Sequence, residues 1–330
     1  MAFLNNLSDT RKILLADLVI LFSALLWGGD YIFAKRALET ISPGYLNAVR
    51  FSICALILLA FLWKRLRGLT RHDLVVGLVT GVMMFGGFVG QTTGLMFTSV
   101  GNNAFITSAY VILVPFIAWA LTRVRPGVNN FVAVFFCMIG IGFLTLQGGF
   151  ALSRGDTITM MGAVFFGFEI ALLGIYAKRM DPLLLALLES LVVGVLFWIY
   201  AFLFENPPVV IDRTLVLSMA YITFFGSVIT HILVTVALKY TSSSHGALLC
   251  ATEAVFGVIL AALFLGERFS RNGWIGSALV LLAVIIAEVG EGIIMGKKKR
   301  ILRAGVMAAP TVLPSGEGLT EPVLQGETDP

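Results

Sequence analysis

The chain has little charge for its length. Only 13% of its 330 residues are charged, whereas 58% are hydrophobic; soluble domains carry roughly 25% charged and about 45–50% apolar residues. The mean hydropathy is +0.95. So little charge cannot cover a water-exposed surface, which excludes an ordinary soluble protein and predicts a protein embedded in a lipid bilayer.

Cysteines and catalytic motifs are scarce as well. Cys54, Cys137 and Cys250 stand alone inside apolar stretches, without the spacing of a metal site or a redox pair. The HExxH, GxSxG and GxxxxGK[ST] motifs of zinc hydrolases, serine hydrolases and nucleotide-binding loops are missing. We therefore expect no enzyme activity, no cofactor, no bound metal and no direct use of ATP.

Long apolar runs fill most of the sequence instead. A helix needs about 20 mostly apolar residues to cross the hydrocarbon core, and that length predicts an all-α membrane protein with ten transmembrane helices. Residues 1–14 lack the features of a cleaved signal peptide and are expected to form a cytoplasmic segment. The polar tail 297–330 is expected to be disordered and cytoplasmic. The predicted spans are 15–35, 43–63, 74–96, 102–122, 128–147, 157–178, 183–204, 214–238, 245–266 and 272–291.

One passage of the chain occurs twice. Residues 101–126 return in looser form at 242–270, with small polar residues, an apolar span and then charge. The repetition predicts two repeats of five helices, 15–147 and 157–291. Because five is odd, the second repeat starts on the opposite side of the membrane, so the repeats are inverted. Inverted repeats are typical of transporters that bind substrate near the midplane and open alternately to each side.

The distribution of lysine and arginine predicts the orientation. With both termini inside, the cytoplasmic side receives 16 of these residues and the other side six. We therefore expect a multi-pass protein of the inner (plasma) membrane with both termini in the cytoplasm. The net charge of +4 is explained by this topology, and no nucleic-acid partner is expected.

Four stretches resemble one known family. They are ALLWGGDYIFAKRAL, ISPGYLNAVRFSICALIL, QTTGLMFTSVGNNAFITSAYVILVPFIAWALTRVRPG and KYTSSSHGALLCATEAVFGVILAALFLGERFSRNGWIGSALVLLA. Together they resemble the EamA-like branch of the drug/metabolite transporter superfamily, over residues 15 to 291. The resemblance implies a central substrate cavity contacted by helices 1, 3, 4, 6, 8 and 9. The family's Glu-Pro pair in the ninth helix is Glu253-Ala254 here, aligned with Val114-Pro115, so we expect the ninth helix to be straighter than the fourth.

Ionisable residues inside a membrane are costly and are candidates for function. Asp30 shares a helix face with Trp27; the alternative is a salt bridge near the interface with Lys35 or Arg36. Glu169 lies among aromatic residues, where it is a candidate substrate or proton site. His231 belongs to a polar stripe with Ser227 and Thr235 that suits a water-filled pathway, although such hydroxyls also bond their own helix.

The remaining candidates have competing structural interpretations. Glu253 is either a gate residue or a packing contact. Arg50 is expected to hold the bundle by pairing with a carboxylate, Glu189 to bond a neighbouring helix, and Pro115 to kink the fourth helix. Three neutral residues, Gln91, Asn103 and Tyr110, are candidates for hydrogen bonds to a polar solute. The glycines of the third helix, spaced by about four residues, predict a tight helix crossing.

The sequence therefore predicts a secondary transporter or exporter of small metabolites, such as amino acids. Its expected partners are a small-molecule substrate and the lipid bilayer, and protonation of Asp30, Glu169 or His231 is a candidate for coupling. One alternative is an antiporter of nucleotide-sugars or sugar phosphates, which would need basic residues at the site where the spans offer only Arg50. The others are an uncoupled facilitator or channel and a non-transporting scaffold.

Overall fold

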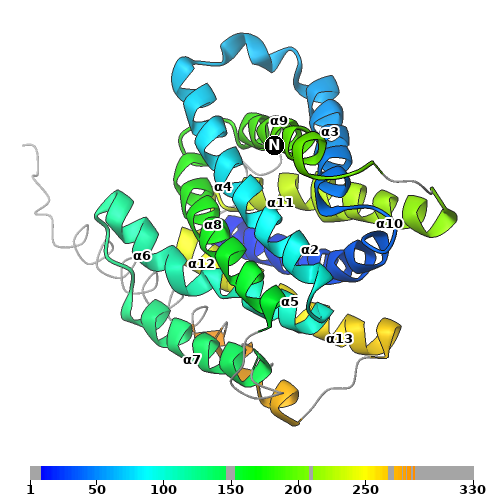
Figure 1. Ribbon diagram of the computed structural model, residues 1–330. Helices are drawn as coiled ribbons and strands as arrows, with labels where there is room; N and C mark the ends of the chain where they lie inside the picture. The colour runs from blue at the N-terminus through cyan, green and yellow to red at the C-terminus, as the bar shows by residue number, and fades with distance from the viewer. Residues whose placement is uncertain are drawn as a thin grey trace, which may run out of the picture. The chain divides into compact units, whose positions relative to one another are not determined.

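The structure is a computed structural model that describes residues 9–145, 153–207 and 211–266, and 271–286 apart from 277, 280 and 284. All regular elements in these ranges are helical (Figure 1). The first half contains α2 (Asp9–Ala37), α3 (Pro43–Leu62), the 3₁₀ helix η1 (Arg65–Gly68), α4 (Arg71–Met96), α5 (Val100–Ser108), α6 (Tyr110–Thr122) and α7 (Val128–Thr145).

The second half begins at α8 and is also helical. Helical stretches also cover 271–276, 278–279, 281–283 and 285–286. The second half contains α8 (Arg154–Tyr176), α9 (Pro182–Phe204), α10 (Arg213–Thr223), the π-helix η2 (Phe224–Ile229), α11 (Thr230–Ala237), α12 (Ser243–Cys250) and α13 (Glu253–Leu265).

Eight helical segments are long and apolar enough to cross a membrane. They are Thr10–Ala37, Pro43–Leu62, Arg71–Met96, Val100–Thr122, Arg154–Tyr176, Pro182–Phe204, Arg213–Ala237 and Ser243–Leu265. They correspond to the predicted spans one to four and six to nine. At the fifth, the apolar stretch Val128–Gly140 is shorter than a full span. Parts of the tenth predicted span, the segment 1–8 and the tail 297–330 lie outside the described residues, so the described chain establishes eight of the ten predicted spans.

Helices of the two halves begin at matching residues. An N-cap side chain accepts a hydrogen bond from the first turn of a helix and so fixes where the helix starts. Ser42 and Asp181 each stand before a proline that opens a helix, α3 in the first half and α9 in the second; the Asp181 side chain accepts such a bond from Leu183, whereas the Ser42 side chain accepts none. The other matched N-caps are Thr70 with Asp212 and Ser99 with Ser242. The repeated sequence therefore becomes a repeated set of helix boundaries.

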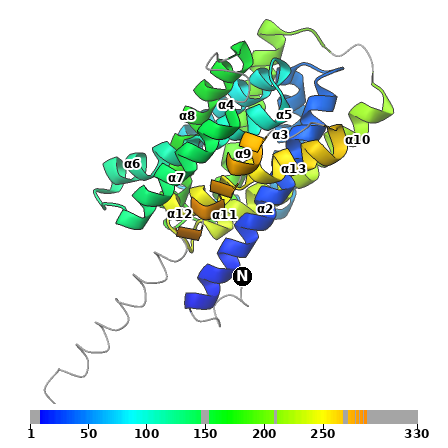
Figure 2. The same cartoon turned by 90° about the horizontal axis from the view of Figure 1, so that it is seen from below.

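The two halves pack mainly on each other. The most extensive helix contacts in the described chain join α4 to α8 and α3 to α9, and α4 and α8 lie side by side in both views (Figure 1 and Figure 2). Contacts also come in matched pairs: α2 packs on α13, as its counterpart α8 packs on α6. This reciprocal packing is the pattern of a two-repeat architecture.

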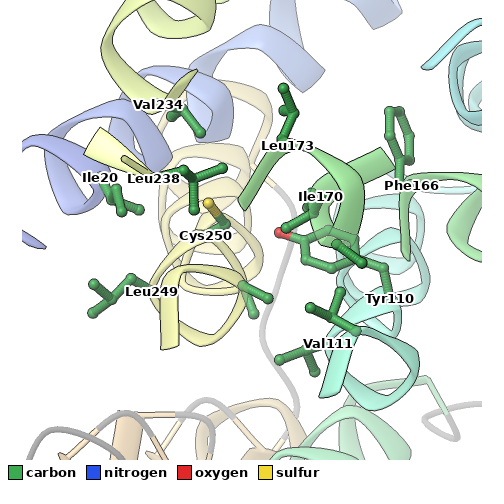
Figure 3. Close-up of a cluster of buried hydrophobic side chains, with 14 of the residues drawn as sticks. Ile20, Tyr110, Val111, Phe166, Ile170, Leu173, Val234, Leu238, Leu249 and Cys250 are labelled. Carbon is green, nitrogen blue, oxygen red and sulfur yellow. The ribbon is translucent and has the colours of Figure 1, made fainter. Parts of the chain in front are cut away.

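Glycines allow α4 and α8 to cross closely, as the sequence predicts. A Cβ atom at Gly90 would overlap the backbone of Gly162, and one at Gly162 would overlap the carbonyl of Gly87. Apolar side chains from both halves then fill the core beside this crossing. Figure 3 shows Ile170 of α8 beside Tyr110 of α6, with Cys250 of α12 next to them; Phe166 of α8 belongs to the same cluster. The core thus draws on both repeats and leads into the pocket described next.

Candidate functional site

A pocket lies where the two halves meet. Its empty volume, including space open to solvent, is about 690 Å³. Both halves contribute carboxylates and aromatic rings to its wall. The lining residues are Trp27, Asp30, Tyr31, Arg50, Phe51, Met84, Phe88, Gln91, Thr107, Tyr110, Phe166, Glu169, Ile170, Leu173, Gly226, Ser227, Thr230, His231, Val234 and Glu253.

One end of the pocket contains a buried ion pair. Nη1 of Arg50 lies 3.1 Å from Oδ2 of Asp30, and both side chains are almost entirely buried. The rings of Phe51 and Phe88 lie near the guanidinium, with centroids 5.3 and 4.8 Å from its carbon. The predicted role of Arg50 as the partner of a carboxylate thus has a geometric counterpart in Asp30. Lys35 bonds the carbonyls of Leu95 and Thr98 instead.

The π-helix η2 supplies polar backbone to the same end. A π-turn displaces carbonyls from the regular helical ladder, and the carbonyl of Gly226 accepts from Nη2 of Arg50 at 3.0 Å and from Nε1 of Trp27 at 3.1 Å. Ser227 Oγ accepts from Nε of Arg50 and donates to the carbonyl of Ile222. The guanidinium is therefore held by one carboxylate, one carbonyl and one hydroxyl.

An insertion of one residue explains where the π-helix forms. From the N-cap Thr70 to the N-cap Ser99 the first half uses 29 residues, and the matching interval from Asp212 to Ser242 uses 30. A helix accommodates one extra residue as a π-turn without shifting its two ends. The second half therefore carries its extra residue at the pocket, where the freed carbonyl finds donors.

Two interrupted helices meet beside the pocket. The fourth span breaks at Ala109, between α5 and α6, and the ninth at Ala251 and Thr252, between α12 and α13. Backbone breaks at membrane depth are tolerated only beside protein or a cavity. Tyr110 and Glu253 are the first residues after the two breaks, and Oη of Tyr110 lies 3.4 Å from Oε1 of Glu253. The breaks thus bring one residue of each repeat into contact.

The ninth helix, expected to be straighter than the fourth, is interrupted as the fourth is. It breaks without a proline because Thr252 bonds backward to the carbonyl of Leu249, at 2.6 Å, which competes with the helical ladder. The alignment of Glu253 with Val114 is also corrected. Counted from the N-caps Ser99 and Ser242, Glu253 matches Tyr110, and Pro115 matches Val258. The loose sequence likeness misplaced this register by one helical turn.

A second ionisable cluster lies on the side of the second repeat. Glu169 lines the pocket from α8 and His231 lines it from α11. Nε2 of His231 lies 3.2 Å from Oε2 of Glu189 on α9, a residue outside the pocket and fully buried. Glu169 and Glu189 also interact electrostatically. The pocket therefore has an arginine-bound carboxylate, Asp30, and a histidine, His231, that contacts a carboxylate behind the lining.

Most of the predicted site residues meet at this pocket. Trp27, Asp30, Gln91, Tyr110, Glu169, His231 and Glu253 line it, together with Arg50. Gln91 donates to the hydroxyl of Tyr31 at 3.0 Å. Three other candidates lie elsewhere: Asn103 bonds the Gln91 carbonyl and Thr159, Glu189 stands behind His231, and Pro115 is inside α6. In the stripe around His231, Thr235 bonds its own helix, as the alternative interpretation held.

The sequence reasoning missed two features. One is the pair of aromatic residues Phe51 and Phe88, which line the pocket but were not candidates. Phe51 follows Arg50 in the sequence, and Phe88 lies one helical turn before Gln91. The other is a buried pair outside the pocket, in which Nε2 of His245 lies 3.2 Å from Oδ1 of Asp17. No pattern of residues on one helix face predicts this pair, because its two members come from different repeats.

The fold and pocket define a class of protein. Two pseudo-symmetric helical repeats that span a membrane and enclose a shared polar pocket are the architecture of a transporter. The profile of the EamA-like transporter family matches residues 14–146 and 153–288. The chain therefore belongs to the EamA-like transporter family and is a membrane transporter of the drug/metabolite superfamily.

Similar proteins agree with this assignment. An uncharacterized transporter of Archaeoglobus fulgidus is 33% identical over 84% of this chain and 87% of its own length. The uncharacterized inner membrane transporter YicL of Salmonella typhimurium is 25% identical over 86% of this chain and 97% of its own. A crystal structure aligns with a TM-score of 0.68 over 83% of this chain and 98% of its own, at 18% identity, and shows the fold alone.

Proposed function

We propose that the protein is a secondary transporter of small amine-bearing metabolites, amino acids and related compounds, that works by alternating access and exchanges its solute for protons. The observation that supports this most is the charge of the pocket. Asp30, Glu169 and Glu253 line it, and the single lysine or arginine among the lining residues, Arg50, is already bound to Asp30. An ammonium group is the solute charge that such a wall complements.

The same observation disfavours the phosphorylated solutes of the superfamily. A phosphate group calls for a lysine or arginine that is available to it. The guanidinium of Arg50 is occupied by Asp30, Gly226 and Ser227, so no lysine or arginine of the lining residues is open to a phosphate. Trp27, Tyr31, Tyr110 and Phe166 would instead enclose the apolar part of a metabolite.

The proposed location follows from the charge distribution and from the names of relatives. The predicted cytoplasmic side carries 16 lysines and arginines and the other side six. YicL is named an inner membrane transporter. We place the protein in the inner membrane with both termini in the cytoplasm.

Counterflow in liposomes tests the function. Purified protein is reconstituted and loaded with each of the proteinogenic amino acids, and also with polyamines, sugar phosphates and nucleotide-sugars; uptake of the labelled solute is then followed. We expect saturable counterflow of at least one amine-bearing solute. Counterflow of phosphorylated solutes alone would contradict the proposal, and flux that rises without saturation would indicate a channel.

A variant of Glu253 links this flux to the pocket. We expect Glu253→Gln to weaken the apparent affinity for an amine by about tenfold or more, because a hydrogen bond to a charged group contributes about 1.5–3 kcal/mol. Glu39→Gln is the matched control, since Glu39 is exposed and outside the pocket. Equal affinities in the two variants would exclude Glu253 from amine recognition.

A further inference from the structure

Equivalent positions of the two repeats carry different ionisable residues. Arg50 stands eight residues after the N-cap Ser42, and Glu189 stands eight residues after the matching N-cap Asp181. Asp30 stands twelve residues before Ser42, and Glu169 twelve before Asp181. The carboxylate and arginine of the first repeat thus correspond to two carboxylates in the second.

This difference leaves the second repeat without a fixed positive charge at the position equivalent to Arg50. In the first repeat Arg50 neutralises Asp30 permanently, since a guanidinium keeps its proton in proteins. In the second repeat the residue at ion-pair distance from Glu189 is His231, at 3.2 Å. Histidine is the side chain whose charge changes near neutral pH. Neutralisation of Glu189 therefore depends on an exchangeable proton.

Because Glu189 is buried, the presence or absence of that proton decides whether its charge is compensated. Its side chain is fully buried, and neither Oε1 nor Oε2 has a hydrogen-bond partner among the described residues; Nε2 of His231 lies near Oε2 but has no such partner either. An uncompensated charge at such a place is strongly unfavourable. His231 both lines the pocket and contacts Glu189, so it connects the buried carboxylate with the solute.

We propose that Glu189 and His231 together form the proton-binding site of the transporter, and that the Asp30–Arg50 pair takes no part in coupling. This inference rests on the proposed function and names where its proton binds. One proton, held on His231 or Glu189, makes the pair neutral; its release into the pocket leaves one negative charge. A cationic amine bound beside His231 compensates that charge, so proton and solute bind alternately and are exchanged.

Other ionisable groups surround this pair. In the pocket lining they are Glu169 on α8 and Glu253 on α13, with Tyr110 beside Glu253. On the helices packed against α9 and α11 they are Asp30 on α2 and Arg50 and Cys54 on α3. Asp30 and Arg50 neutralise each other, and Cys54 contacts Ser190. Glu169 is the other carboxylate that interacts with Glu189, so its own variant is included in the test.

Proteoliposomes separate coupling from solute exchange. An inward or outward pH gradient of one unit is imposed, and accumulation of the amino acid with the fastest counterflow is measured. Coupling of one proton to one solute predicts about tenfold accumulation in the wild type. We expect Glu189→Gln to abolish the accumulation while still allowing measurable counterflow, and Glu189→Asp to keep part of it. Ser190→Ala, the neighbouring residue on α9, is the matched control and should accumulate like the wild type.

The possible outcomes are distinct. Gradient-driven accumulation that persists in Glu189→Gln, or that is lost in Glu169→Gln alone, would overturn this inference and leave the transport function standing. Accumulation driven by a sodium gradient without a pH gradient would also overturn it. Failure of the wild type to exchange any solute of the panel would instead reject the proposed function.

A spectroscopic measurement covers the case in which Glu189→Gln does not fold. The chain has three histidines, His72, His231 and His245, so the wild-type protein labelled at histidine gives a simple nitrogen NMR spectrum. The Nε2 signal of His231 is assigned with single substitutions of the other two histidines. Its chemical shift should report a change in the protonation of His231 when the amino acid binds. A His231 signal that is insensitive to both solute and pH would refute the proton-binding pair.

Discussion

At the scale of single residues, Arg50 connects parts of the chain that are far apart in sequence. Its guanidinium contacts Asp30 of α2 and Gly226 and Ser227 of η2, with the ring of Phe88 beneath it. A buried ion pair adds little net stability over a well-packed apolar pair, but removal of one partner leaves an uncompensated charge. Arg50 thus matters for stability mainly because its loss would leave the buried Asp30 without a counter-charge.

Replacement of Arg50 tests this point. We expect Arg50→Gln to lower the free energy of unfolding by about 3–5 kcal/mol, because Asp30 stays buried without its partner. The double variant Asp30→Asn with Arg50→Gln should be less destabilised. Unfolding in mixed detergent micelles measures both.

The exposed pair Arg65–Asp181 provides the control. Its side chains are 48% and 27% exposed, with Arg65 Nη1 at 2.6 Å from Asp181 Oδ2. Arg65→Gln should cost no more than about 1 kcal/mol, since exposed ion pairs contribute little. If Arg50→Gln were as mild as Arg65→Gln, the ion pair would not be essential to the fold.

At the scale of elements, the π-helix η2 has a strict steric requirement. A Cβ atom at Gly226 would overlap Oδ1 of Asp30 and approach Nη2 of Arg50. We therefore expect Gly226→Ala to displace the ion pair and to reduce transport at least as much as Arg50→Gln does. Counterflow and unfolding measurements on the same preparation check this.

A second glycine serves as the control for that substitution. Gly142 lies in α7 and has open space where a Cβ atom would go. Gly142→Ala should keep wild-type transport and gain up to about 1 kcal/mol of helix stability. Loss of transport in Gly142→Ala would show that glycine replacement is harmful in general and would remove the argument for η2.

The start of α3 is capped by a residue from the second repeat. Glu205 accepts from Ser42 Oγ at 2.6 Å and from the backbone N–H of Gly44 at 2.9 Å. Negative charge at a helix N-terminus is stabilising. We expect Glu205→Ala to cost about 1–2 kcal/mol, in the upper range of N-cap losses. Glu39→Ala, an exposed glutamate, should be neutral in the same unfolding assay; equal losses would argue against the cap.

At the scale of the whole molecule, orientation can be measured with cysteines. The native Cys54, Cys137 and Cys250 are buried and are first replaced. Cysteine introduced at Gly68 should react with a membrane-impermeant maleimide only from the cytoplasmic side, and cysteine at Asp212 only from the other side, because the charge distribution places these two loops on opposite sides. The reverse labelling pattern would mean that both termini lie outside.

Sequence alone predicted the helical class, the family and the positions of eight spans, since those depend on apolar length and repetition. It also placed seven of the eight leading site candidates in the pocket lining. It could not reveal the π-helix, because a one-residue insertion is visible only once the N-caps of both repeats are known. It could not pair Asp30 with Arg50 or Glu189 with His231, because those contacts depend on how distant helices pack.

The dominance of contacts between the repeats has a consequence for biosynthesis. Helices α3 and α4 make their most extensive contacts with α9 and α8, which are translated later. While only the first half has left the ribosome, the glycine-rich face of α4 and the Arg50 region of α3 have no partner. The first repeat therefore stays in the membrane without its final tertiary structure until the second repeat is made. A chain truncated after the first repeat should be degraded unless the second repeat is supplied as a separate polypeptide.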